Sequence, residues 1–331
     1  MASSQQSPKV QLAPFRVAPI FDPRIWGFRD LRPWYDQVVQ SGDPIGEVWL
    51  TGDECRVATG PHAGEKLAQL FSQEPRALLG TTAPFTASPL LIKVLFAKEK
   101  LSVQVHPDDA MAHKYGEPRG KTECWYALAA KPGAQVALGL KPGVTLDQVR
   151  VEIHAGTLEA SLNMVPVTAG DLIFVDAGTV HSIWPGSILL ETQQNCDLTY
   201  RMYDYGRPRE LHIEKSLEAT RLVTRAGKIA PIVLEDRTIL IDVEYFRVER
   251  IPVEGSRSSA SLPGEGEPAP GLAYLFAAEG AGRIAGAAFE PVELPARSIV
   301  AVPASSPPFT VENRGALDLI RITPNWPAKT Q

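Results

Sequence analysis

Polar side chains occupy every second position of a short hydrophobic stretch at residues 101–106, LSVQVH. In a β-strand, residues two positions apart lie on the same face, so Ser102, Gln104 and His106 share one face while the intervening residues pack on the other. Pro107 and the two aspartates that follow are expected to end this strand. One face therefore presents a hydroxyl, an amide and an imidazole together.

A second strand is expected at residues 121–128, KTECWYAL, where Lys121 and Glu123 share a face. If the two strands pair, the Glu123 carboxylate converges with Gln104 and His106. Imidazole, carboxylate and amide oxygen form a donor set that suits zinc or another borderline divalent metal. The pattern predicts a metal site; the alternative is a group of polar residues satisfied by one another in the mouth of a barrel.

A third segment at residues 170–181, GDLIFVDAGTVH, supplies a further imidazole. Glycine-containing turns flank a buried strand at 172–175, and the second turn brings His181 to the start of the next strand. This spacing resembles the second motif of cupins, except that Asp176 stands where that motif usually has proline. Because aspartate also suits a tight turn, the departure is expected to be local.

Four longer motifs occur in a specific order and spacing: QVHPDD from residue 104, GKTECWYAL from 120, GTVHSI from 178 and ETQQNCDLTYRMYDYGRPR from 191. Together they resemble the type I mannose-6-phosphate isomerases, especially the short bacterial form. The likeness is close over residues 10–220 and general beyond them. It implies an all-β dominated fold, a cupin jelly-roll barrel with inserted helices. It also implies a metal-dependent enzyme that interconverts mannose 6-phosphate and fructose 6-phosphate through a cis-enediolate.

The resemblance implies one zinc ion per chain, or another divalent metal, held by Gln104, His106, Glu123 and His181. Two neutral imidazoles and a carboxylate would bind it, and the Gln104 carbonyl oxygen would add a weaker contact. Such a set leaves room for water or substrate. A divalent metal can polarise a carbonyl group and stabilise the negative charge that develops on oxygen. Proton transfer of this kind needs no redox cofactor.

The resemblance also suggests catalytic groups. Arg201 matches the family's catalytic arginine, and its permanent charge could stabilise the enediolate or guide ring opening. The alternative is a surface ion pair with Asp197 or Asp204. Glu191 is favoured as the base, with Lys121 as the other candidate. Alternatively, Glu191 only supports a metal ligand.

Phosphate binding is expected at Ser102 and Lys121, with Lys93 or Lys100 nearby, because hydroxyl and ammonium groups suit a dianion. Lys93 interrupts an apolar run at 89–96 that predicts a strand buried on both faces. A buried lysine is costly unless it is paired or used, so a substrate contact and a side chain that reaches the strand end are equally supported. Lys100 stands in the sequence KEK, where the alternative is simple exposure to solvent.

Short helices are expected between the strands. The predicted segments are 29–40 with Pro33 in its first turn, 64–71, 108–115, 145–155 with Thr145 as N-cap, and 210–221. His113 and His212 fall within these segments and are interpreted as structural residues. The four proposed ligands are complete without them.

After residue 230 the sequence consists of alternating, strand-like segments and a turn-rich loop. This change predicts a catalytic cupin domain at 1–230 and a smaller β-barrel or sandwich at 231–331. Strands are expected at 238–251, 271–280, 297–305 and 316–324, with a turn-rich loop at 256–271. None of the six histidines follows His212. The second domain therefore cannot build a histidine-based metal site and is expected to pack, cap or stabilise.

Composition limits the remaining possibilities. The chain has 331 residues, 44% hydrophobic and 21% charged, which is typical of a soluble globular protein. A net charge of −5 gives no basis for nucleic-acid binding. No apolar run suits a membrane span or a signal peptide, and the three widely spaced cysteines are expected to be reduced thiols. We expect a cytoplasmic monomer or weak homodimer that acts on a small sugar phosphate.

Two other functions share these residues. One is a cupin isomerase for a different sugar, such as glucose 6-phosphate. The other is a non-catalytic cupin module that binds sugar and retains the metal. The joint presence of Glu191, Arg201 and Lys121 favours an enzyme, since a binding module has little need for all three.

Overall fold

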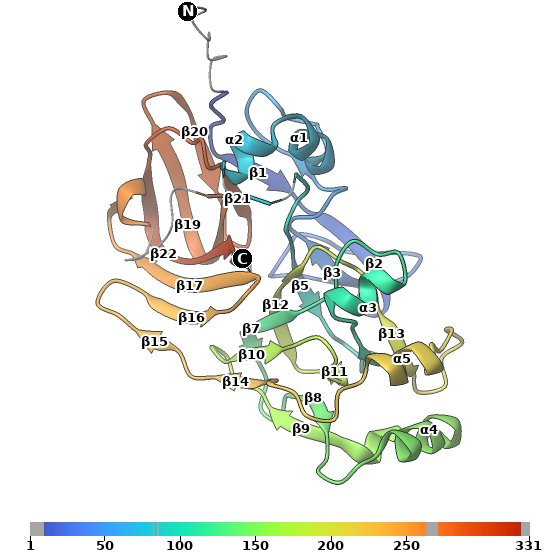
Figure 1. Cartoon of the computed structure of the whole chain (residues 1–331). Coiled ribbons are helices and arrows are strands. Elements are labelled where there is room, and N and C mark those ends of the chain that lie inside the picture. The colour runs from blue at the N-terminus through green and yellow to red at the C-terminus, as the bar shows by residue number, and fades with distance from the viewer. Residues whose placement is uncertain (1–9, 82, 85, 263–270, 326–331) are drawn as a thin grey trace, which may run out of the picture. The chain divides into compact units, whose positions relative to one another are not determined.

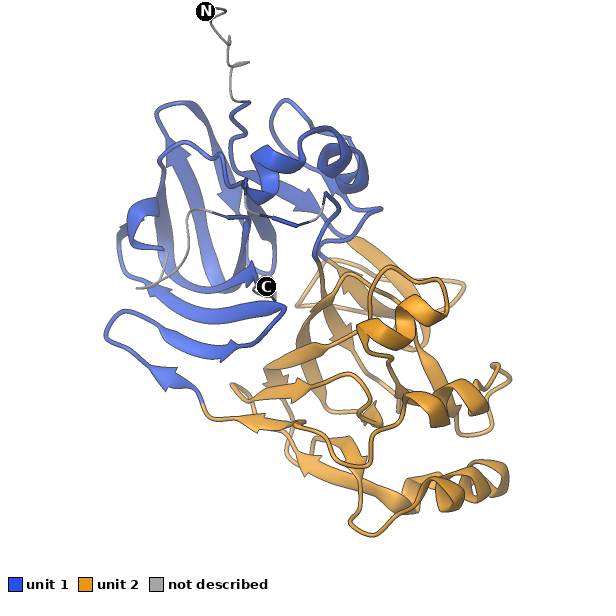
Figure 2. Ribbon diagram, in the orientation of Figure 1, with its two compact units in different colours: residues 1–19, 50–89, 231–331 blue, residues 20–49, 90–230 orange. Residues whose placement is uncertain are grey.

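The computed structural model describes residues 10–81, 83–84, 86–262 and 271–325. The chain forms two compact units, each assembled from separate segments (Figure 2). One unit comprises residues 20–49 and 90–230, and the other 1–19, 50–89 and 231–331. One junction therefore falls at residue 230, as in the predicted division, but the segments 1–19 and 50–89 group with the C-terminal part of the chain.

Two antiparallel sheets build the unit of residues 20–49 and 90–230 (Figure 1). The seven-stranded sheet has the order β14 (Gly227–Ile229), β10 (Leu172–Val175), β7 (Glu123–Ala130), β12 (Ser187–Gln194), β5 (Leu90–Phe96), β3 (Ile45–Trp49), β2 (Ile20–Phe28). The five-stranded sheet has the order β13 (Tyr200–Tyr203), β6 (Val103–Val105), β11 (His181–Ile183), β8 (Gln135–Leu140), β9 (Leu162–Pro166). Sequence neighbours are often not sheet neighbours, as expected for a jelly roll.

The predicted alternation in residues 101–106 is present. Val103 and Val105 are fully buried in a hydrophobic cluster with Val149 and Leu217, which come from the helices α4 (Leu146–Ala155) and α5 (Ile213–Ala219). Gln104 is on the opposite face of the same strand and lines a cavity. Helix packing on one face of the small sheet thus turns the polar face of β6 inward.

The helices largely follow the predicted segments. Helix α3 (Asp109–Lys114) is capped by the Asp108 carboxylate, and α4 by the Thr145 hydroxyl, which accepts from the backbone N–H of Gln148. A single turn, η1 (Leu158–Ser161), follows α4. The 64–71 and 210–221 segments are represented by α1 (Leu67–Gln73) and α5, each shorter than predicted at one end or both.

The prediction of a helix at 29–40 is wrong. This segment consists of turns and an isolated bridge between Asp30 and Val38. The Asp30 carboxylate accepts from both the backbone N–H and the guanidinium of Arg32. Such local side-chain to backbone hydrogen bonds favour turns over helix.

The other unit contains a ten-stranded sheet. Its main order is β15 (Ile232–Val233), β16 (Thr238–Asp242), β17 (Phe246–Val253), β22 (Thr310–Pro324), β19 (Ala273–Gly286), β21 (Ile299–Val302), β1 (Phe15–Ala18), β4 (Arg56–Val57), with β18 (Ser256–Ser258) on β22 and β20 (Phe289–Leu294) on β19. Helices α1 and α2 (Pro75–Leu79) and the turn η2 (Ser259–Ser261) complete it. The predicted strand at 238–251 is two strands, β16 and β17, joined by a turn. Part of the predicted loop at 256–271 lies outside the described residues. None of the described helices is long and apolar enough to cross a membrane.

Candidate active site and metal centre

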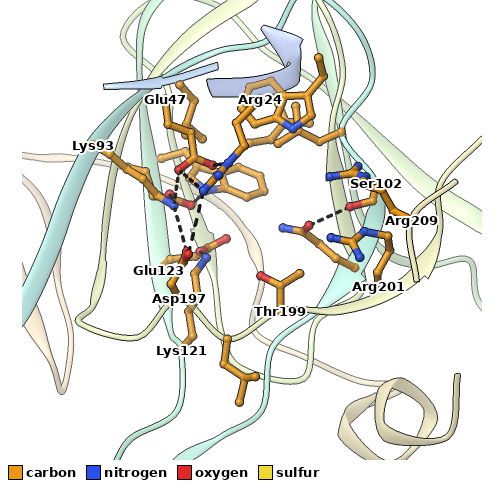
Figure 3. Close-up of a pocket in the computed structure, with 18 residues that line it drawn as sticks. Arg24, Glu47, Lys93, Ser102, Lys121, Glu123, Asp197, Thr199, Arg201 and Arg209 are labelled. Carbon is orange, nitrogen blue, oxygen red and sulfur yellow. Dashed lines mark hydrogen bonds and ion pairs between the residues drawn. The ribbon is translucent and has the colours of Figure 1, made fainter. Parts of the chain in front are cut away.

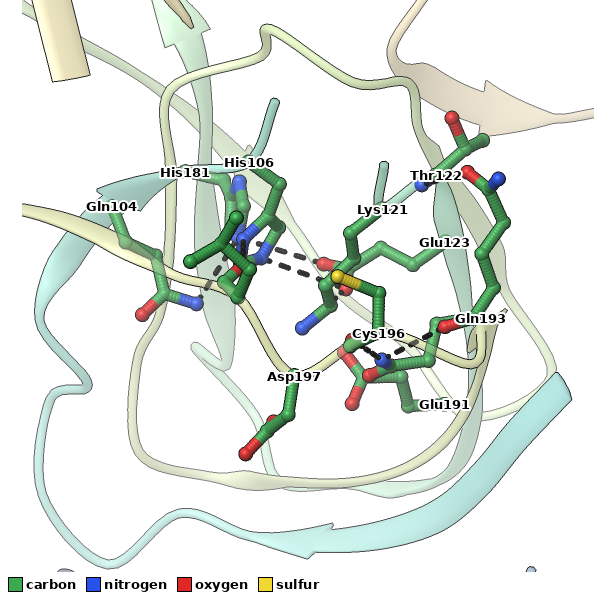
Figure 4. Close-up of polar contacts among 12 residues, drawn as sticks. Gln104, His106, Lys121, Thr122, Glu123, His181, Glu191, Gln193, Cys196 and Asp197 are labelled. Carbon is green, nitrogen blue, oxygen red and sulfur yellow. Dashed lines mark hydrogen bonds and ion pairs between the residues drawn. The ribbon is translucent and has the colours of Figure 1, made fainter. Parts of the chain in front are cut away.

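Three of the four predicted metal ligands meet in the interior of the unit of residues 20–49 and 90–230 (Figure 4). His106 Nε2 lies 3.7 Å from Glu123 Oε2, and His181 Nε2 lies 3.5 Å from Glu123 Oε1. All three side chains are buried, each about 1% exposed. Ligand atoms that surround one tetrahedral zinc ion at about 2.0–2.1 Å are roughly 3.3 Å apart, so this spacing is close to that of a zinc site.

Backbone carbonyl groups fix the tautomers of both histidines. Nδ1 of His106 donates to the carbonyl oxygen of Leu198, and Nδ1 of His181 donates to that of Thr179, each over 2.9 Å. The Nε2 lone pairs therefore face Glu123. Burial is the main cause that lowers the pKa of His106, and it lowers that of His181 to about 4, so both rings are neutral near pH 7. Neutral, carbonyl-anchored imidazoles are the usual metal-binding form.

The unpaired polar atoms of this group suit a cation. Within the part of the chain that the structure describes, Nε2 of His106 and Oε1 of Glu123 are buried without a hydrogen-bond partner, and Oε2 of Glu123 forms an ion pair only with the ammonium group of Lys121. Burial and then the negative charge of Glu191 raise the pKa of the Glu123 carboxyl, although Lys121, 3.1 Å away, partly offsets them. Buried charges of this kind are stable when they coordinate a metal. The residues therefore fit a divalent metal ion.

Gln104, the fourth predicted ligand, lies beside the three. It is the cross-strand neighbour of His181, and its Nε2 donates to His181 Nε2 over 3.3 Å. The Ser102 hydroxyl donates to its Oε1. Rotation of the amide by 180° would turn the oxygen toward the site, and Ser102 could then accept instead of donate. The role of Gln104 as a fourth ligand, through its carbonyl oxygen, stays a prediction.

Glu191 is held on both sides by its cross-strand neighbours. In the seven-stranded sheet it lies opposite Trp125 in β7 and Lys93 in β5. Trp125 Nε1 donates to Oε1 over 3.1 Å, and Lys93 Nζ lies 3.0 Å from Oε2. Burial raises the pKa of Glu191, but Lys93 and Lys121 outweigh it and lower the pKa to about 2. The side chain is therefore an oriented, ionised carboxylate.

Lys93 is part of a buried charge network. Besides Glu191, its ammonium group lies 3.3 Å from Glu47 and 3.8 Å from Asp197. Glu47 also pairs with Arg24, over 3.2 Å. Three carboxylates thus surround one lysine that is 3% exposed. Lys93 is therefore paired inside the protein and does not reach solvent at the strand end.

These residues line a cavity of about 400 Å³ (Figure 3). Among the predicted site residues, the lining includes Lys93, Ser102, Gln104, Lys121, Glu123, Glu191 and Arg201. Lys100 is not in the lining. Its ammonium group pairs with Glu159 at 2.8 Å and lies 3.7 Å from the centroid of the Trp184 ring. Lys100 is therefore not available to a substrate in this cavity.

Arg201 enters the cavity from the small sheet. It is the cross-strand neighbour of Gln104, and its Nη1 donates to the backbone carbonyl of Glu210 over 2.8 Å. Asp204 is occupied by Arg209, with two contacts of 2.6 and 2.7 Å. Among the described residues, no ion pair joins Arg201 to a carboxylate. The surface ion-pair alternative thus finds no support in the geometry.

Comparison with known proteins identifies the family. A family model described as phosphomannose isomerase type I, catalytic domain, matches residues 15–139. The mannose-6-phosphate isomerase of Streptococcus mutans is 36% identical over 247 residues, which are 70% of this chain and 77% of that protein. The chain belongs to the type I phosphomannose isomerase family. A second member, ManA of Bacillus subtilis, is 36% identical over 74% of this chain and 81% of its own length.

Solved structures of phosphomannose isomerases share the fold. The mannose 6-phosphate isomerase from Bacillus subtilis has a TM-score of 0.81 at 30% identity, covering 94% of this chain and 100% of that one. A zinc-bound mannose 6-phosphate isomerase shares the fold with a TM-score of 0.75 at 16% identity. The predicted family, the cupin fold and the status as an enzyme are therefore confirmed.

The residues of this phosphomannose isomerase site that escaped prediction include Arg24, Glu47 and Trp125. Arg24 and Glu47 come from β2 and β3, far from the motifs in sequence, and join the site only through sheet order. A signal was present, because Glu47 and Lys93 are opposite charges within two otherwise apolar strands. Buried charges occur in pairs, so each could have predicted the other.

Proposed function

We propose that the protein interconverts mannose 6-phosphate and fructose 6-phosphate, with one zinc ion per chain. The observation that carries this proposal is a cavity lined by Glu123, Glu191 and Arg201, with His106 and His181 beside Glu123, in a chain of this family. The donor set of two imidazoles, a carboxylate and an amide favours zinc over magnesium or calcium, which prefer all-oxygen sites.

The bound metal would supply a positive charge that polarises the sugar carbonyl group and stabilises its developing negative charge. Glu191 would take the proton from carbon 2 and return it to carbon 1. Its carboxylate is ionised at pH 7 and oriented by Trp125 and Lys93, as a general base must be. Lys121, buried and 3.1 Å from Glu123, remains the second candidate for moving protons between the substrate oxygens.

Arg201 would stabilise the oxyanion formed when the proton leaves. A guanidinium group carries its charge at every accessible pH and offers a planar pair of donors. Such preorganised donors are among the largest contributions to catalysis when they face developing charge. Because Arg201 has a permanent positive charge, it would repel a metal cation. Its proposed partner is therefore the anionic intermediate, which it would stabilise.

The substrate phosphate would bind at the side of the cavity where Ser102 and Arg201 lie (Figure 3). Five cationic and four anionic side chains line the cavity, so a bound divalent metal makes it clearly positive. This local charge suits a dianion although the whole chain carries −5. We retain Ser102 from the predicted phosphate ligands and set Lys93 and Lys100 aside, because carboxylates already engage both.

The decisive experiment is a coupled assay on purified protein that has been stripped of metal and reloaded with zinc. We expect turnover of mannose 6-phosphate that depends on added metal. Glucose 6-phosphate, tested in parallel at equal concentration, should react far more slowly. Faster turnover of glucose 6-phosphate would instead support an isomerase for a different sugar.

A further inference from the structure

His212 makes an unusual pair of hydrogen bonds with the backbone of Arg201. The backbone N–H of His212 donates to the Arg201 carbonyl over 2.7 Å, and the backbone N–H of Arg201 donates to Nδ1 of His212 over 3.1 Å. The guanidinium of Arg201 donates to the carbonyl of Glu210, two residues before His212. The segment 210–212 therefore contacts Arg201 at its backbone N–H, its carbonyl and its side chain.

The position of β13 explains why Arg201 needs these contacts. β13 is the edge strand of the five-stranded sheet and pairs on one side with β6. An edge strand leaves backbone donors and acceptors without a neighbouring strand. Its register to β6 also shifts between Arg201 and Tyr203, and such a shift weakens the pairing locally. His212 provides the hydrogen bonds that a neighbouring strand would otherwise make with Arg201. Arg201 is the residue of β13 whose side chain lines the cavity.

The imidazole of His212 is suited to accept. Burial lowers its pKa, as do Arg201 and Lys215, although Glu210 partly offsets them, so the ring is neutral near pH 7. Because Nδ1 accepts from Arg201, the ring proton is on Nε2. The ring also lies beside Tyr200, with centroids 6.2 Å apart, which limits its rotation.

We infer that His212 is a positioning residue that holds the backbone of Arg201 and thereby directs its guanidinium into the cavity. This inference rests on the proposed role of Arg201 in catalysis. His212 itself does not line the cavity; its ring contacts the backbone of Arg201 and the ring of Tyr200, and its backbone carbonyl accepts from the N–H of Ser216 in α5. It therefore acts through Arg201 and not on the substrate.

The test compares His212→Asn with His212→Leu, each in the wild-type and Arg201→Ala backgrounds. Asparagine keeps an acceptor at the δ position, whereas leucine keeps bulk and removes the acceptor. We expect His212→Leu to lower kcat by about tenfold or more with KM changed less, and His212→Asn to restore most of it. In the Arg201→Ala background, His212→Leu should cause no further loss, because residues that act as one unit are non-additive. Metal content should be unchanged, and His113→Leu should be neutral.

Two results would overturn the inference: a kcat of His212→Leu close to that of wild type, or an equal further loss when Arg201 is already alanine. The second result would indicate a general structural role. A crystal structure of His212→Leu gives a readout that does not depend on the substrate. We expect the Arg201 backbone and guanidinium to be displaced, and an unmoved Arg201 would refute the inference even if the sugar differs from mannose 6-phosphate. A displaced Arg201 in a protein inactive on mannose 6-phosphate would refute only the proposed function.

Discussion

The indole Nε1 of Trp125 donates a hydrogen bond to Oε1 of Glu191 over 3.1 Å, between the neighbouring strands β7 and β12 of the seven-stranded sheet. Since Lys93 approaches the other oxygen, the indole decides which way the carboxylate plane faces. A base must be held in the geometry of attack as well as in the right charge state. The fully buried Trp125 therefore orients the proposed base.

Trp125→Phe should keep the packing of the ring but remove the donor. A hydrogen bond to a buried charged group contributes about 1.5–3 kcal/mol, so we expect kcat to fall by about tenfold or more. Steady-state kinetics and thermal unfolding would be measured together. Trp184→Phe removes an indole N–H outside the cavity lining and should leave kcat unchanged. Equal kcat in the two variants would exclude the orienting role.

Removal of one proposed ligand should abolish stoichiometric metal binding. His181→Ala and Glu123→Ala each take one donor from a buried set of three. Elemental analysis of wild type should give about one divalent metal per chain, and both variants should give much less. His113→Ala is the matched control, since the His113 ring contacts only the backbone carbonyl of Pro118 in an exposed position. Equal metal content in wild type and His181→Ala would disprove the ligand assignment.

Arg201→Ala should lower kcat by about a hundredfold or more, the cost of losing one strong oxyanion partner, with unchanged metal content. Arg201→Lys should recover little if the planar pair of donors is needed. Arg150→Ala, which removes a surface arginine paired with Glu214, is the control and should be neutral. Near-normal turnover of Arg201→Ala would exclude a role in the chemical step.

Lys100 offers a test of the phosphate assignment. Because its ammonium group pairs with Glu159 outside the cavity lining, Lys100→Met should change KM for mannose 6-phosphate by less than about twofold. Ser102→Ala, which alters the lining itself, should raise KM. A large rise of KM in Lys100→Met would support the prediction that Lys100 contacts the phosphate.

Glu249 should matter for stability and not for catalysis. It is fully buried in β17, with Arg321 at 2.5 Å and Arg247 at 3.1 Å. Glu249→Ala removes the closest carboxylate from two buried guanidinium groups and should lower the free energy of unfolding by about 3–5 kcal/mol. Glu293→Ala in the same unit breaks only an exposed pair with Arg314 and should cost about 1 kcal/mol or less. Below the melting transition, both variants should keep the kinetic constants of wild type; a hundredfold loss of kcat in folded protein would reveal a catalytic contribution from this unit.

Sequence alone could predict the features that depend on local pattern. The alternation around Gln104 and His106 determines which face is polar, and glycine turns determine where His181 begins its strand. Asp176 supports that turn as expected, since its carboxylate accepts from the Thr179 hydroxyl and from the backbone N–H of Arg225. These effects act over a few residues.

The remaining features depend on the register between strands that are distant in sequence. The row of Trp125, Glu191, Lys93 and Trp49 across four strands exists only once β7, β12, β5 and β3 lie side by side. Single-sequence periodicity shows that each strand is buried and does not show which residues face one another. Lys93 therefore looked equally suited to substrate and to internal pairing, and Lys100 could not be distinguished from a cavity residue.

The segmented composition of the two units has a consequence for biosynthesis. β1 begins at Phe15, and one of its partner strands, β21, ends at Val302, with Phe15 opposite Ala301. A ribosome must therefore release nearly the whole polypeptide before the first strand finds that neighbour, and until then an apolar edge is open to other nascent chains. Truncation before residue 299 would leave the same edge exposed permanently. The pairing of β1 with β21 therefore closes only after residues 299–302 have been synthesised, so this unit completes its sheet late.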